Sequence, residues 1–452
     1  MKKLFGTDGI RGVANEYPMT AEMALQVGRA VVGYFARTGN GNRIVIGKDT
    51  RLSGDMLEAG LVSGICAAGG NACLTGVLPT PGVAYAASAL KAAAGIVISA
   101  SHNPYYDNGF KIFGGDGYKL SDETESELEK VILGEKNHRQ RFDSSKLGTV
   151  KHYRTAEADY AAFLKNTLSS AKPFQGLKII LDCSNGATYR IAPQLFAELG
   201  ADVAALAVEP NGTNINDDCG SEHTAALIQK VVGTRADIGL AFDGDGDRLI
   251  AVAETGQVLS GDHILAICAR HMKQAGTLAN NLVVSTVMSN LGFGVALKQM
   301  QIDHEVAQVG DRYVMQRMMA SGAVLGGEDS GHMIFADHHT TGDGMLTALK
   351  LIEAVQAANK ALSQLSAIMT VYPQVLLNVA VDAKPALEDV PQIIETIRSV
   401  EAELGDKGRV LVRYSGTQPL CRVMVEGPDE ADTRGFCQQI ADIIKVNLGG
   451  GL

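Results

Sequence analysis

The sequence predicts an α/β protein with three similar, doubly wound, mixed-sheet α/β domains and a smaller C-terminal α+β domain. The chain has 452 residues, and at about 150 residues per domain this length suggests about three domains. Short apolar runs alternate with helical patterns over blocks of about 100 residues, which is typical of doubly wound α/β units. The last part of the chain, about 80 residues long, has a different order of elements and predicts the α+β domain.

The first block shows the pattern that the next two repeat. Residues 43–47 form an apolar run long enough for a buried strand, and residues 56–68 follow with apolar side chains at helical spacing. A second strand is expected at 95–98. The polar helix expected at 121–132 begins at Ser121, which precedes acidic residues in the first turn.

The second and third blocks repeat this alternation of strands and helices. The second has expected strands at 177–181, 203–208 and 238–242 and helices at 191–199 and 222–232. The third has strands at 282–287, 305–306 and 323–325 and helices at 264–273, 291–299 and 313–319. The remaining residues predict strands at 375–381, 409–413 and 421–425, a helix at 390–404 and a final amphipathic helix. We therefore expect domains at residues 1–150, 151–255, 256–370 and 371–452.

Composition and charge exclude several classes of protein. The chain has 40 Lys and Arg against 50 Asp and Glu, so its formal net charge is −10, which argues against nucleic acid as a partner. The seven cysteines include no CxxC pair, which argues against a disulfide scaffold or a thiolate zinc site. Because neither a signal peptide nor an apolar run of membrane-spanning length is recognisable, we expect a cytoplasmic protein without a membrane partner.

The strongest local signal is the aspartate loop, residues 243–248, with the sequence DGDGDR. Asp243, Asp245 and Asp247 follow an apolar strand, and carboxylate oxygens are suitable ligands for Mg²⁺ or Ca²⁺. An EF-hand is the main rival, but it needs glycine at its sixth position, where this chain has Arg248. The loop could also be an acidic surface turn that binds no ligand, although three like charges this close together favour a bound cation.

Three other loops follow expected strands and carry chemically useful side chains. Residues 99–104 (SASHNP) place Ser101 where ligands bind in doubly wound folds, beyond a strand's carboxyl end. Residues 326–332 (GGEDSGH) offer a carboxylate, a hydroxyl and an imidazole that could hold sugar hydroxyls. Residues 413–419 (RYSGTQP), with Arg422 beyond, could cradle a phosphate. Taken singly, each is also an ordinary turn.

Together, and in this order, the four loops resemble those of the α-D-phosphohexomutase superfamily. The opening segment, residues 5–12 (FGTDGIRG), resembles the branch that interconverts glucosamine 6-phosphate and glucosamine 1-phosphate for UDP-N-acetylglucosamine synthesis. The resemblance covers essentially the whole chain. It implies four domains around a central cleft, a phosphosugar substrate, one Mg²⁺ per chain, and a hexose 1,6-bisphosphate as intermediate or activator. It leaves a monomer and a homodimer both open.

The resemblance also implies a role for each loop. Ser101 would be the phosphorylated serine, and it would bind Mg²⁺ with Asp243, Asp245 and Asp247. Lys111 and His332 are candidates for proton transfer, with Arg11 and Arg248 as catalytic cations beside them. Glu328 and Ser330 would hold sugar hydroxyls. The non-reacting phosphate would be held by a set in the last domain: Arg413, Ser415, Gly416, Thr417 and Arg422.

The chain departs from the family pattern at three positions. Tyr414 and Gln418 stand where the phosphate loop commonly has Pro and Glu, and neither change removes a phosphate donor. Asp329 stands where this branch often has Gln or Asn, and we hypothesise that its carboxylate favours the ammonium group of the substrate. A phosphomannomutase/phosphoglucomutase of the same superfamily is the main alternative. A non-catalytic phosphosugar-binding relative and a metal-dependent phosphatase are less consistent with the motifs.

Overall fold

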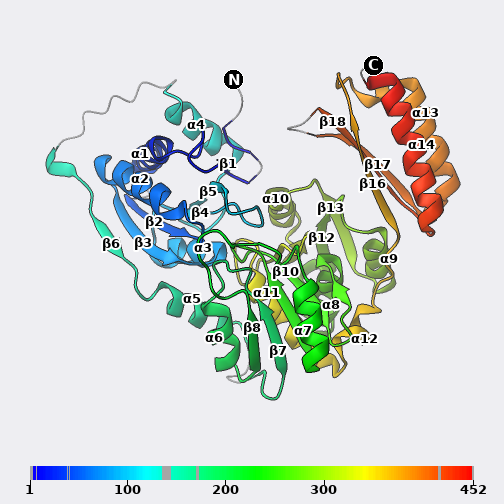
Figure 1. Ribbon diagram of the computed structural model, residues 1–452, viewed down its shortest axis with the longest axis horizontal. Helices are drawn as coiled ribbons and strands as arrows, with labels where there is room; N and C mark the ends of the chain where they lie inside the picture. The colour runs from blue at the N-terminus through cyan, green and yellow to red at the C-terminus, as the bar shows by residue number, and fades with distance from the viewer. Residues whose placement is uncertain are drawn as a thin grey trace. The chain divides into compact units, whose positions relative to one another are not determined.

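The computed structural model describes residues 4–6, 8–37, 39, 41–134, 144–168, 173–415 and 419–449 (Figure 1). These residues divide into two compact units. The first comprises residues 1–288 and 302–367, and the second comprises residues 289–301 and 368–452. The predicted loops at 99–104, 243–248 and 326–332 lie in the first unit, and the loop at 413–419 lies in the second. Each unit is therefore described by itself.

The first sheet has six strands in the order β1-β5-β4-β2-β3-β6. Its parallel part consists of β2 (Arg43–Lys48), β3 (Asn71–Val77), β4 (Ala94–Ile98) and β6 (Val150–His152), and the antiparallel part adds β1 (Ile10–Val13) and β5 (Asp107–Gly114). One face packs against α1 (Ala21–Arg37), α2 (Gly54–Ala67) and α4 (Asp122–Ile132). Val83 of α3 (Thr80–Ala89) lies close to Gly47 of β2 and Gly95 of β4. Ser121 caps α4 by accepting a hydrogen bond from the Thr124 amide.

The second and third sheets repeat the central topology of the first. The second sheet has the order β11-β10-β9-β7-β8 and the third has the order β13-β12-β14-β15. In each of the three, the first strand of the repeat lies between its second and third strands, which run parallel to it, and a fourth strand pairs antiparallel with the third. This shared order confirms three similar, mixed-sheet α/β units.

The predicted strands and helices of the second and third repeats lie close to observed ones, and both repeats also contain elements that were not predicted. The second repeat has β7 (Lys178–Asp182), α6 (Ile191–Glu198), β8 (Asp202–Leu206), α7 (Ala225–Thr234), β9 (Ile238–Phe242), β10 (Leu249–Ala253) and β11 (Val258–Leu259). The third has α8 (Gly261–Ala275), β12 (Leu282–Thr286), α9 (Leu291–Gln299), β13 (Asp303–Ala307), α10 (Asp311–Ser321), β14 (Leu325–Gly327), β15 (Met333–Phe335), α11 (Gly344–Ala358) and α12 (Leu362–Ser366). The helix α5 (Ala156–Lys165) connects the first two repeats.

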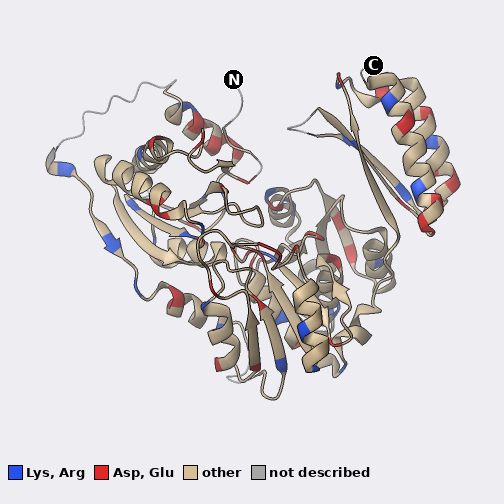
Figure 2. Cartoon of the chain, viewed as in Figure 1, with Lys and Arg blue, Asp and Glu red and all other residues tan. Residues whose placement is uncertain are grey.

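The second unit contains an antiparallel sheet of three strands in the order β16-β18-β17. Its strands are β16 (Gln374–Ala380), β17 (Arg409–Tyr414) and β18 (Leu420–Glu426), and its helices include α13 (Pro391–Leu404) and α14 (Glu430–Leu448). The two helices and the sheet share one apolar core. Figure 2 shows acidic and basic residues interspersed along α13 and α14, as expected for amphipathic helices with one face in solvent.

Candidate active site

The aspartate loop connects two buried antiparallel strands, β9 and β10. Gly246 has a φ of +72°, a left-handed conformation that favours glycine. The turn brings one carboxylate oxygen from each of Asp243, Asp245 and Asp247 within 4.8 Å of the others, and all three residues are buried. The convergence expected from the alternating glycines is therefore present in the structure.

The serine loop follows β4 and meets the aspartate loop directly. Ser101 is 1% exposed, and its Oγ donates a hydrogen bond of 2.5 Å to Asp243 Oδ2. Its φ is +55°, an unusual conformation for a residue with a Cβ. A Cβ at Gly244 would lie 2.6 Å from the Ser101 carbonyl oxygen, so the close approach of the two loops requires glycine there.

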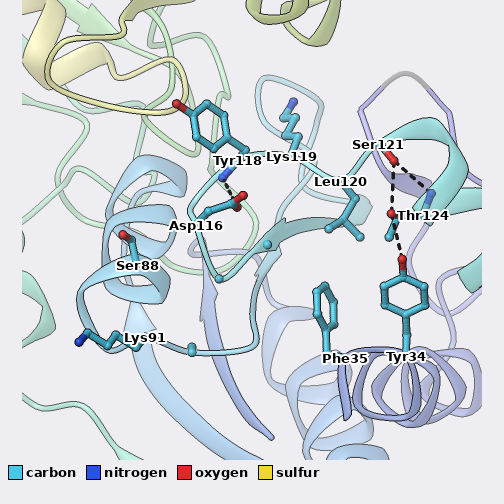
Figure 3. A pocket seen from close by; sticks show the side chains of 13 residues that line it. Tyr34, Phe35, Ser88, Lys91, Asp116, Tyr118, Lys119, Leu120, Ser121 and Thr124 are labelled. Carbon is cyan, nitrogen blue, oxygen red and sulfur yellow. Dashed lines mark hydrogen bonds between the residues drawn. The ribbon is translucent and has the colours of Figure 1, made fainter. Parts of the chain in front are cut away.

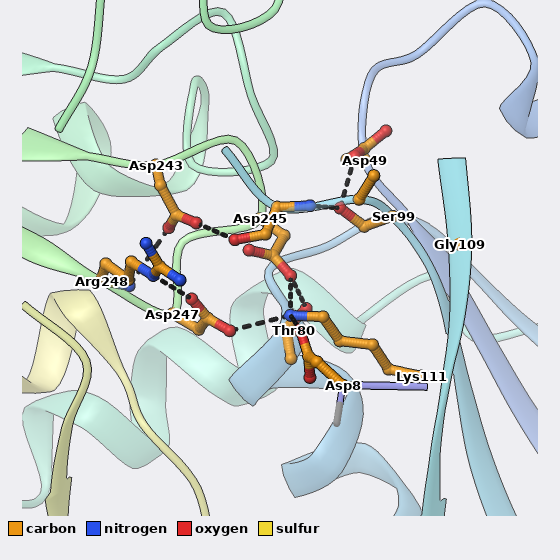
Figure 4. Close-up of polar contacts among 12 residues, drawn as sticks. Asp8, Asp49, Thr80, Ser99, Gly109, Lys111, Asp243, Asp245, Asp247 and Arg248 are labelled. Atoms are coloured by element: carbon orange, nitrogen blue, oxygen red, sulfur yellow. Dashed lines mark hydrogen bonds and ion pairs between the residues drawn. The ribbon is translucent and has the colours of Figure 1, made fainter. Parts of the chain in front are cut away.

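Lys111 lies between the two loops as a buried cation. It projects from β5, which pairs antiparallel with β4 and sets Lys111 opposite Val97. Its Nζ lies 2.8 Å from Asp245 Oδ2, 2.9 Å from Asp247 Oδ2 and 3.3 Å from an oxygen of Asp8 (Figure 4). Burial lowers the pKa of Lys111, but the three carboxylates raise it further, so the pKa lies well above its ordinary value.

The aspartate loop keeps acceptor oxygens that fit a metal ion. Asp245 Oδ1 and Asp247 Oδ1 are buried and have no hydrogen-bond partner. Burial, followed by the charges of Asp247 and Asp245, raises the pKa of Asp243 well above its usual range. A hard divalent cation would satisfy these oxygens and offset the repulsion. Asp243, Asp245, Asp247 and Ser101 Oγ are thus a suitable donor set for Mg²⁺.

Charged side chains surround this centre on the side of the first and third repeats. Asp8 contacts Arg11, Lys111 and Lys119, and Lys119 also contacts Asp311 with an N–O distance of 2.5 Å. Burial would raise the pKa of Asp8, but these cations hold it well below its usual range. The structure therefore joins the opening segment to the aspartate loop through a continuous chain of ion pairs.

His332 and Arg248 complete the centre. They form an isolated β-bridge, and the Arg248 amide donates to Asp243 Oδ1 at 3.1 Å. His332 Nε2 lies 3.5 Å from an oxygen of Asp311 and 3.9 Å from one of Asp247. Neither ring nitrogen of the buried His332 has a hydrogen-bond partner. Unpaired buried polar atoms are rare in folded proteins, and they mark positions where a ligand can bind.

The loop at 326–332 lies beside the same centre. The amide of Leu249, next to Arg248, donates to the carbonyl of Gly331. Glu328 Oε1 accepts from the Gly310 amide at 2.9 Å, while the buried hydroxyl of Ser330 has no partner. Asp329 Oδ1 accepts from the Asp262 amide at 3.4 Å, at the start of α8. The structure thus places the loop with Glu328 and Ser330 next to Arg248.

The second unit contains the predicted phosphate-binding arginines. Arg413 on β17 lies directly opposite Arg422 on β18, and like charges in this position repel each other. Burial, and then the charge of Arg422, lowers the pKa of Arg413. Ser415 follows β17, and its amide donates to the Leu420 carbonyl. Gly416, Thr417 and Gln418 lie outside the described residues.

The first unit contains two cavities outside the predicted loops. A cavity of about 640 Å³ is lined by side chains from α1, the end of α3 and residues 114–124 (Figure 3). Asp116 and residues 118–121 also border a second cavity of about 290 Å³, whose other wall includes Asp311 and Arg312. Lys119 joins both cavities to the chain of ion pairs. None of the predicted site residues lines either one.

Four family models match consecutive parts of the chain. They are the phosphoglucomutase/phosphomannomutase alpha/beta/alpha domains I, II and III and the C-terminal domain, which match residues 2–139, 158–256, 260–372 and 376–443, respectively. The chain belongs to the phosphoglucomutase/phosphomannomutase family. This membership confirms the resemblance, and it makes the chain an isomerase.

Full-length relatives narrow the position of the chain within the phosphoglucomutase/phosphomannomutase family. It is 56% identical to the phosphoglucosamine mutase of Syntrophus aciditrophicus, with 99% of this chain and 100% of the relative covered. It is 54% identical to the phosphoglucosamine mutase of Syntrophobacter fumaroxidans, again with 99% and 100% covered. The chain is therefore similar over almost its whole length to phosphoglucosamine mutases.

Solved structures share the fold of this phosphoglucomutase/phosphomannomutase family member. A family protein from Burkholderia thailandensis is 25% identical, with a TM-score of 0.82 and 100% of both chains covered. The Aspergillus fumigatus N-acetylphosphoglucosamine mutase, solved with GlcNAc-6P and magnesium, is 16% identical, with a TM-score of 0.68 over 98% of this chain and 95% of that one. The second likeness concerns the fold alone.

Several residues of the site were not predicted from the sequence. Asp8 contacts Lys111, Asp311 contacts Lys119, and Thr80 Oγ1 donates to Asp245 Oδ2 at 2.6 Å. Asp49 and Arg51 lie behind the serine loop. The sequence could have indicated Asp49 and Arg51 as site residues, because they follow β2, which is the neighbour of β4, at the carboxyl edge of a parallel sheet.

Proposed function

We propose that the chain interconverts glucosamine 6-phosphate and glucosamine 1-phosphate through a phosphorylated Ser101. One observation carries the site assignment: the Ser101 hydroxyl contacts Asp243 in a buried centre where two further carboxylate oxygens have no partner. Relatives that are about half identical over the whole chain and are named phosphoglucosamine mutase support the choice of sugar. The product would serve UDP-N-acetylglucosamine synthesis.

The proposed reaction consists of two phosphoryl transfers. In the first, the bond between phosphorus and Ser101 Oγ breaks while a bond forms between phosphorus and O1 of the 6-phosphosugar, which gives a 1,6-bisphosphate. The bisphosphate then reverses its orientation, the bond between phosphorus and O6 breaks, and Ser101 Oγ takes this phosphoryl group. Mg²⁺ bound by the three aspartates would supply charge neutralisation at the transferred phosphoryl group.

Lys111 and His332 have different proposed roles. The raised pKa of Lys111 keeps its ammonium charged in the resting centre, and this ammonium can donate a proton to the departing Ser101 Oγ because a serine alkoxide is a stronger base. His332 has two unpartnered ring nitrogens and is the candidate that accepts the proton from the attacking sugar hydroxyl. Arg11 adds positive charge close to the serine loop, and Arg248 adds positive charge at the aspartate loop.

Substrate recognition is proposed for two loops. Glu328 and Ser330 would hold sugar hydroxyls, and Asp329 would favour the ammonium group of glucosamine. Arg413, Ser415, Gly416, Thr417 and Arg422 would hold the phosphate that does not react. The facing pair of Arg413 and Arg422 supports this assignment, because an anion between two guanidinium groups relieves their repulsion. A planar fork can hold phosphate from either end of the sugar.

We also propose that the reaction takes place in the cytoplasm. The described residues contain no helix long and apolar enough to cross a membrane. Seven free cysteines, five of them buried, are consistent with a reducing cytoplasm. The four matched domain models support the proposed division into a phosphoserine domain, a metal-binding domain, a sugar-binding domain and a phosphate-binding domain. Monomer and homodimer both remain compatible with the proposed site.

The test compares rates on glucosamine, glucose and mannose 6-phosphates with the phosphorylated protein. We expect the highest kcat/KM for glucosamine 6-phosphate, and a higher value for either other sugar would replace the proposed substrate. Intact mass should show a form about 80 Da heavier, the mass of one added phosphate. Ser101→Ala should lose this form and its mutase activity, whereas Ser63→Ala, on an exposed face of α2, should keep both. Phosphate release without isomerisation would favour a phosphatase.

Asp329→Asn tests the ammonium hypothesis separately. The substitution removes a charge and keeps the shape of the side chain, so we expect kcat/KM to fall more for glucosamine 6-phosphate than for glucose 6-phosphate. Equal changes for the two sugars would contradict a role for the Asp329 charge.

A further inference from the structure

The backbone of Ser101 is held from both sides by side chains outside the reacting centre. The Ser101 carbonyl oxygen accepts from Arg51 Nη2 at 2.8 Å and from Asn216 Nδ2 at 2.9 Å. The carbonyl of Asn103 accepts from the same two nitrogens, at 2.8 and 2.9 Å. Two donors from different repeats therefore share the same pair of carbonyl groups.

Arg51 is unusual for a guanidinium, since it is only 3% exposed. Its Nη1 donates to the carbonyls of Pro104 and Asp107, so the whole serine loop curls around one side chain. Its Nε donates to Asp49 Oδ2 at 2.8 Å. A rigid planar fork with several donors suits this task, and a lysine could reach only part of these acceptors.

Asp49 connects the fork to the other side of Ser101. Ser99 Oγ donates to Asp49 Oδ2 at 2.5 Å and accepts from the Ser101 amide at 3.0 Å. Both the N–H and the C=O of Ser101 are thus fixed by groups that lead back to Asp49 and Arg51. Ser101 needs this support because its left-handed φ is costly for a residue with a side chain.

Asn216 brings the second repeat into the same arrangement. The φ of Asn216 is +58°, and its backbone N–H donates to the carbonyl of Ser184, which follows β7. A Cβ at Gly244 would lie 2.8 Å from Asn216 Nδ2, so the aspartate loop, Asn216 and the serine loop are closely packed. A change at Asn216 alters the support of Ser101 without removing a charge.

We infer that Arg51 and Asn216 are positioning residues that fix the backbone of Ser101, so that its phosphoryl group points at the aspartate loop and in line with the sugar hydroxyl. This inference rests on the proposed function, because it assumes that Ser101 carries the phosphoryl group. Both side chains contact the backbone of the serine loop, and we assign neither of them a contact with the substrate. Their effect is therefore on the rate of transfer and not on the affinity for the sugar.

Asn216→Gly is the main test. Glycine accepts the left-handed φ, so the substitution deletes the two side-chain hydrogen bonds and leaves the backbone unstrained. We expect kcat to fall by about 10- to 100-fold, the effect of misplacing reacting atoms by a fraction of an ångström to one ångström, with KM changed less than about twofold. Asn359→Gly is the matched control, because it is an exposed Asn with a left-handed φ of 49° at the end of α11, and it should leave kcat unchanged.

A second readout follows the serine itself. After loading with a hexose 1,6-bisphosphate, the ³¹P spectrum of the wild type should show one narrow phosphoserine resonance. We expect a broadened or split resonance in Asn216→Gly and in Arg51→Lys, which keeps the charge next to Asp49. An unchanged resonance together with an unchanged kcat would overturn the inference, as would a loss that appears only in KM.

The wild type separates this inference from the proposed function. If it neither accepts a phosphoryl group on Ser101 nor isomerises the sugar, the proposed function fails. If it does both, and Asn216→Gly and Arg51→Lys match it in kcat and in the ³¹P spectrum, only the positioning role fails. If kcat falls in proportion to the loss of thermal stability in Asn216→Gly, Arg51→Lys and Asn359→Gly alike, this result would also count against positioning.

Discussion

Replacement of Lys111 by methionine tests the electrostatic design of the centre without any assumption about turnover. Lys111 is 2% exposed, and its ammonium contacts Asp245, Asp247 and Asp8. Removing one partner of a buried ion pair costs about 3–5 kcal/mol, because the remaining charge is left uncompensated. Methionine retains most of the length and apolar stem of lysine, so the loss is mainly electrostatic.

Lys48→Met is the matched control. Lys48 also contacts two carboxylates, Asp55 and Glu58, each at 2.6 Å, but its side chain is 14% exposed and Asp55 is 90% exposed. Glu58 is only 15% exposed, but solvent reaches this site more freely than the buried centre, and ion pairs open to solvent contribute about 0–1 kcal/mol. We therefore expect Lys111→Met to lower the free energy of unfolding by about 2–5 kcal/mol more than Lys48→Met does, the difference between these two ranges.

The assay is urea unfolding of both variants and the wild type in EDTA, followed by circular dichroism. Equal losses in the two variants would refute the reasoning. A second series with Mg²⁺ should restore more stability to Lys111→Met than to Lys48→Met, because a cation that binds only the folded state stabilises it, and the carboxylates of the first variant are left without their ammonium.

Three other predictions concern packing and titration. Gly244→Ala should abolish mutase activity in a coupled assay and destabilise the chain by about 1–3 kcal/mol, because its Cβ would lie 2.6 Å from the Ser101 carbonyl oxygen. Gly233→Ala, in α7 with nothing within 4 Å of the new Cβ, should instead stabilise it by about 0.5–1 kcal/mol in thermal unfolding. Tyr160→Phe removes the hydroxyl that donates to Asp343 at 2.7 Å. Burial raises the pKa of Asp343 to about 6 and the Tyr160 hydrogen bond opposes this rise, so the variant should lose about 1–3 kcal/mol at pH 8 and less at pH 5, and a pH-independent loss would contradict this coupling.

The chemically important loops could be predicted because their residue types follow recognisable strands. Asp243, Asp245 and Asp247 come after an uninterrupted apolar strand, β9, and Ser101 comes after β4, so local sequence indicates both the fold and the edge of the sheet. Their meeting could be expected only from the general rule that ligands bind at this edge. The hydrogen bond between Ser101 and Asp243 spans 142 residues, and no local pattern specifies it.

Long-range register, which no local pattern shows, brings the supporting residues to the centre. Lys111 reaches the aspartate loop only because β5 turns back antiparallel to β4. Asp8 and Asp311 were missed for this reason, since Asp8 contacts Lys111 from the first repeat and Asp311 contacts Lys119 from the third repeat. Several elements were missed for a different reason: β3 contains Asn and Gly, and α11 is apolar on most of its faces and lacks the amphipathic pattern that predicts a helix.

The support of Ser101 by Asn216 and Asp243 also affects the order of events during protein synthesis. A ribosome that has released only the first repeat into the cytoplasm has produced the serine loop without Asn216 and Asp243, which are still to be translated. Domains generally fold as units from the N-terminal side as the chain emerges. The nascent first repeat can therefore fold its sheet early, but Ser101 reaches its final environment only after β9 has left the exit tunnel.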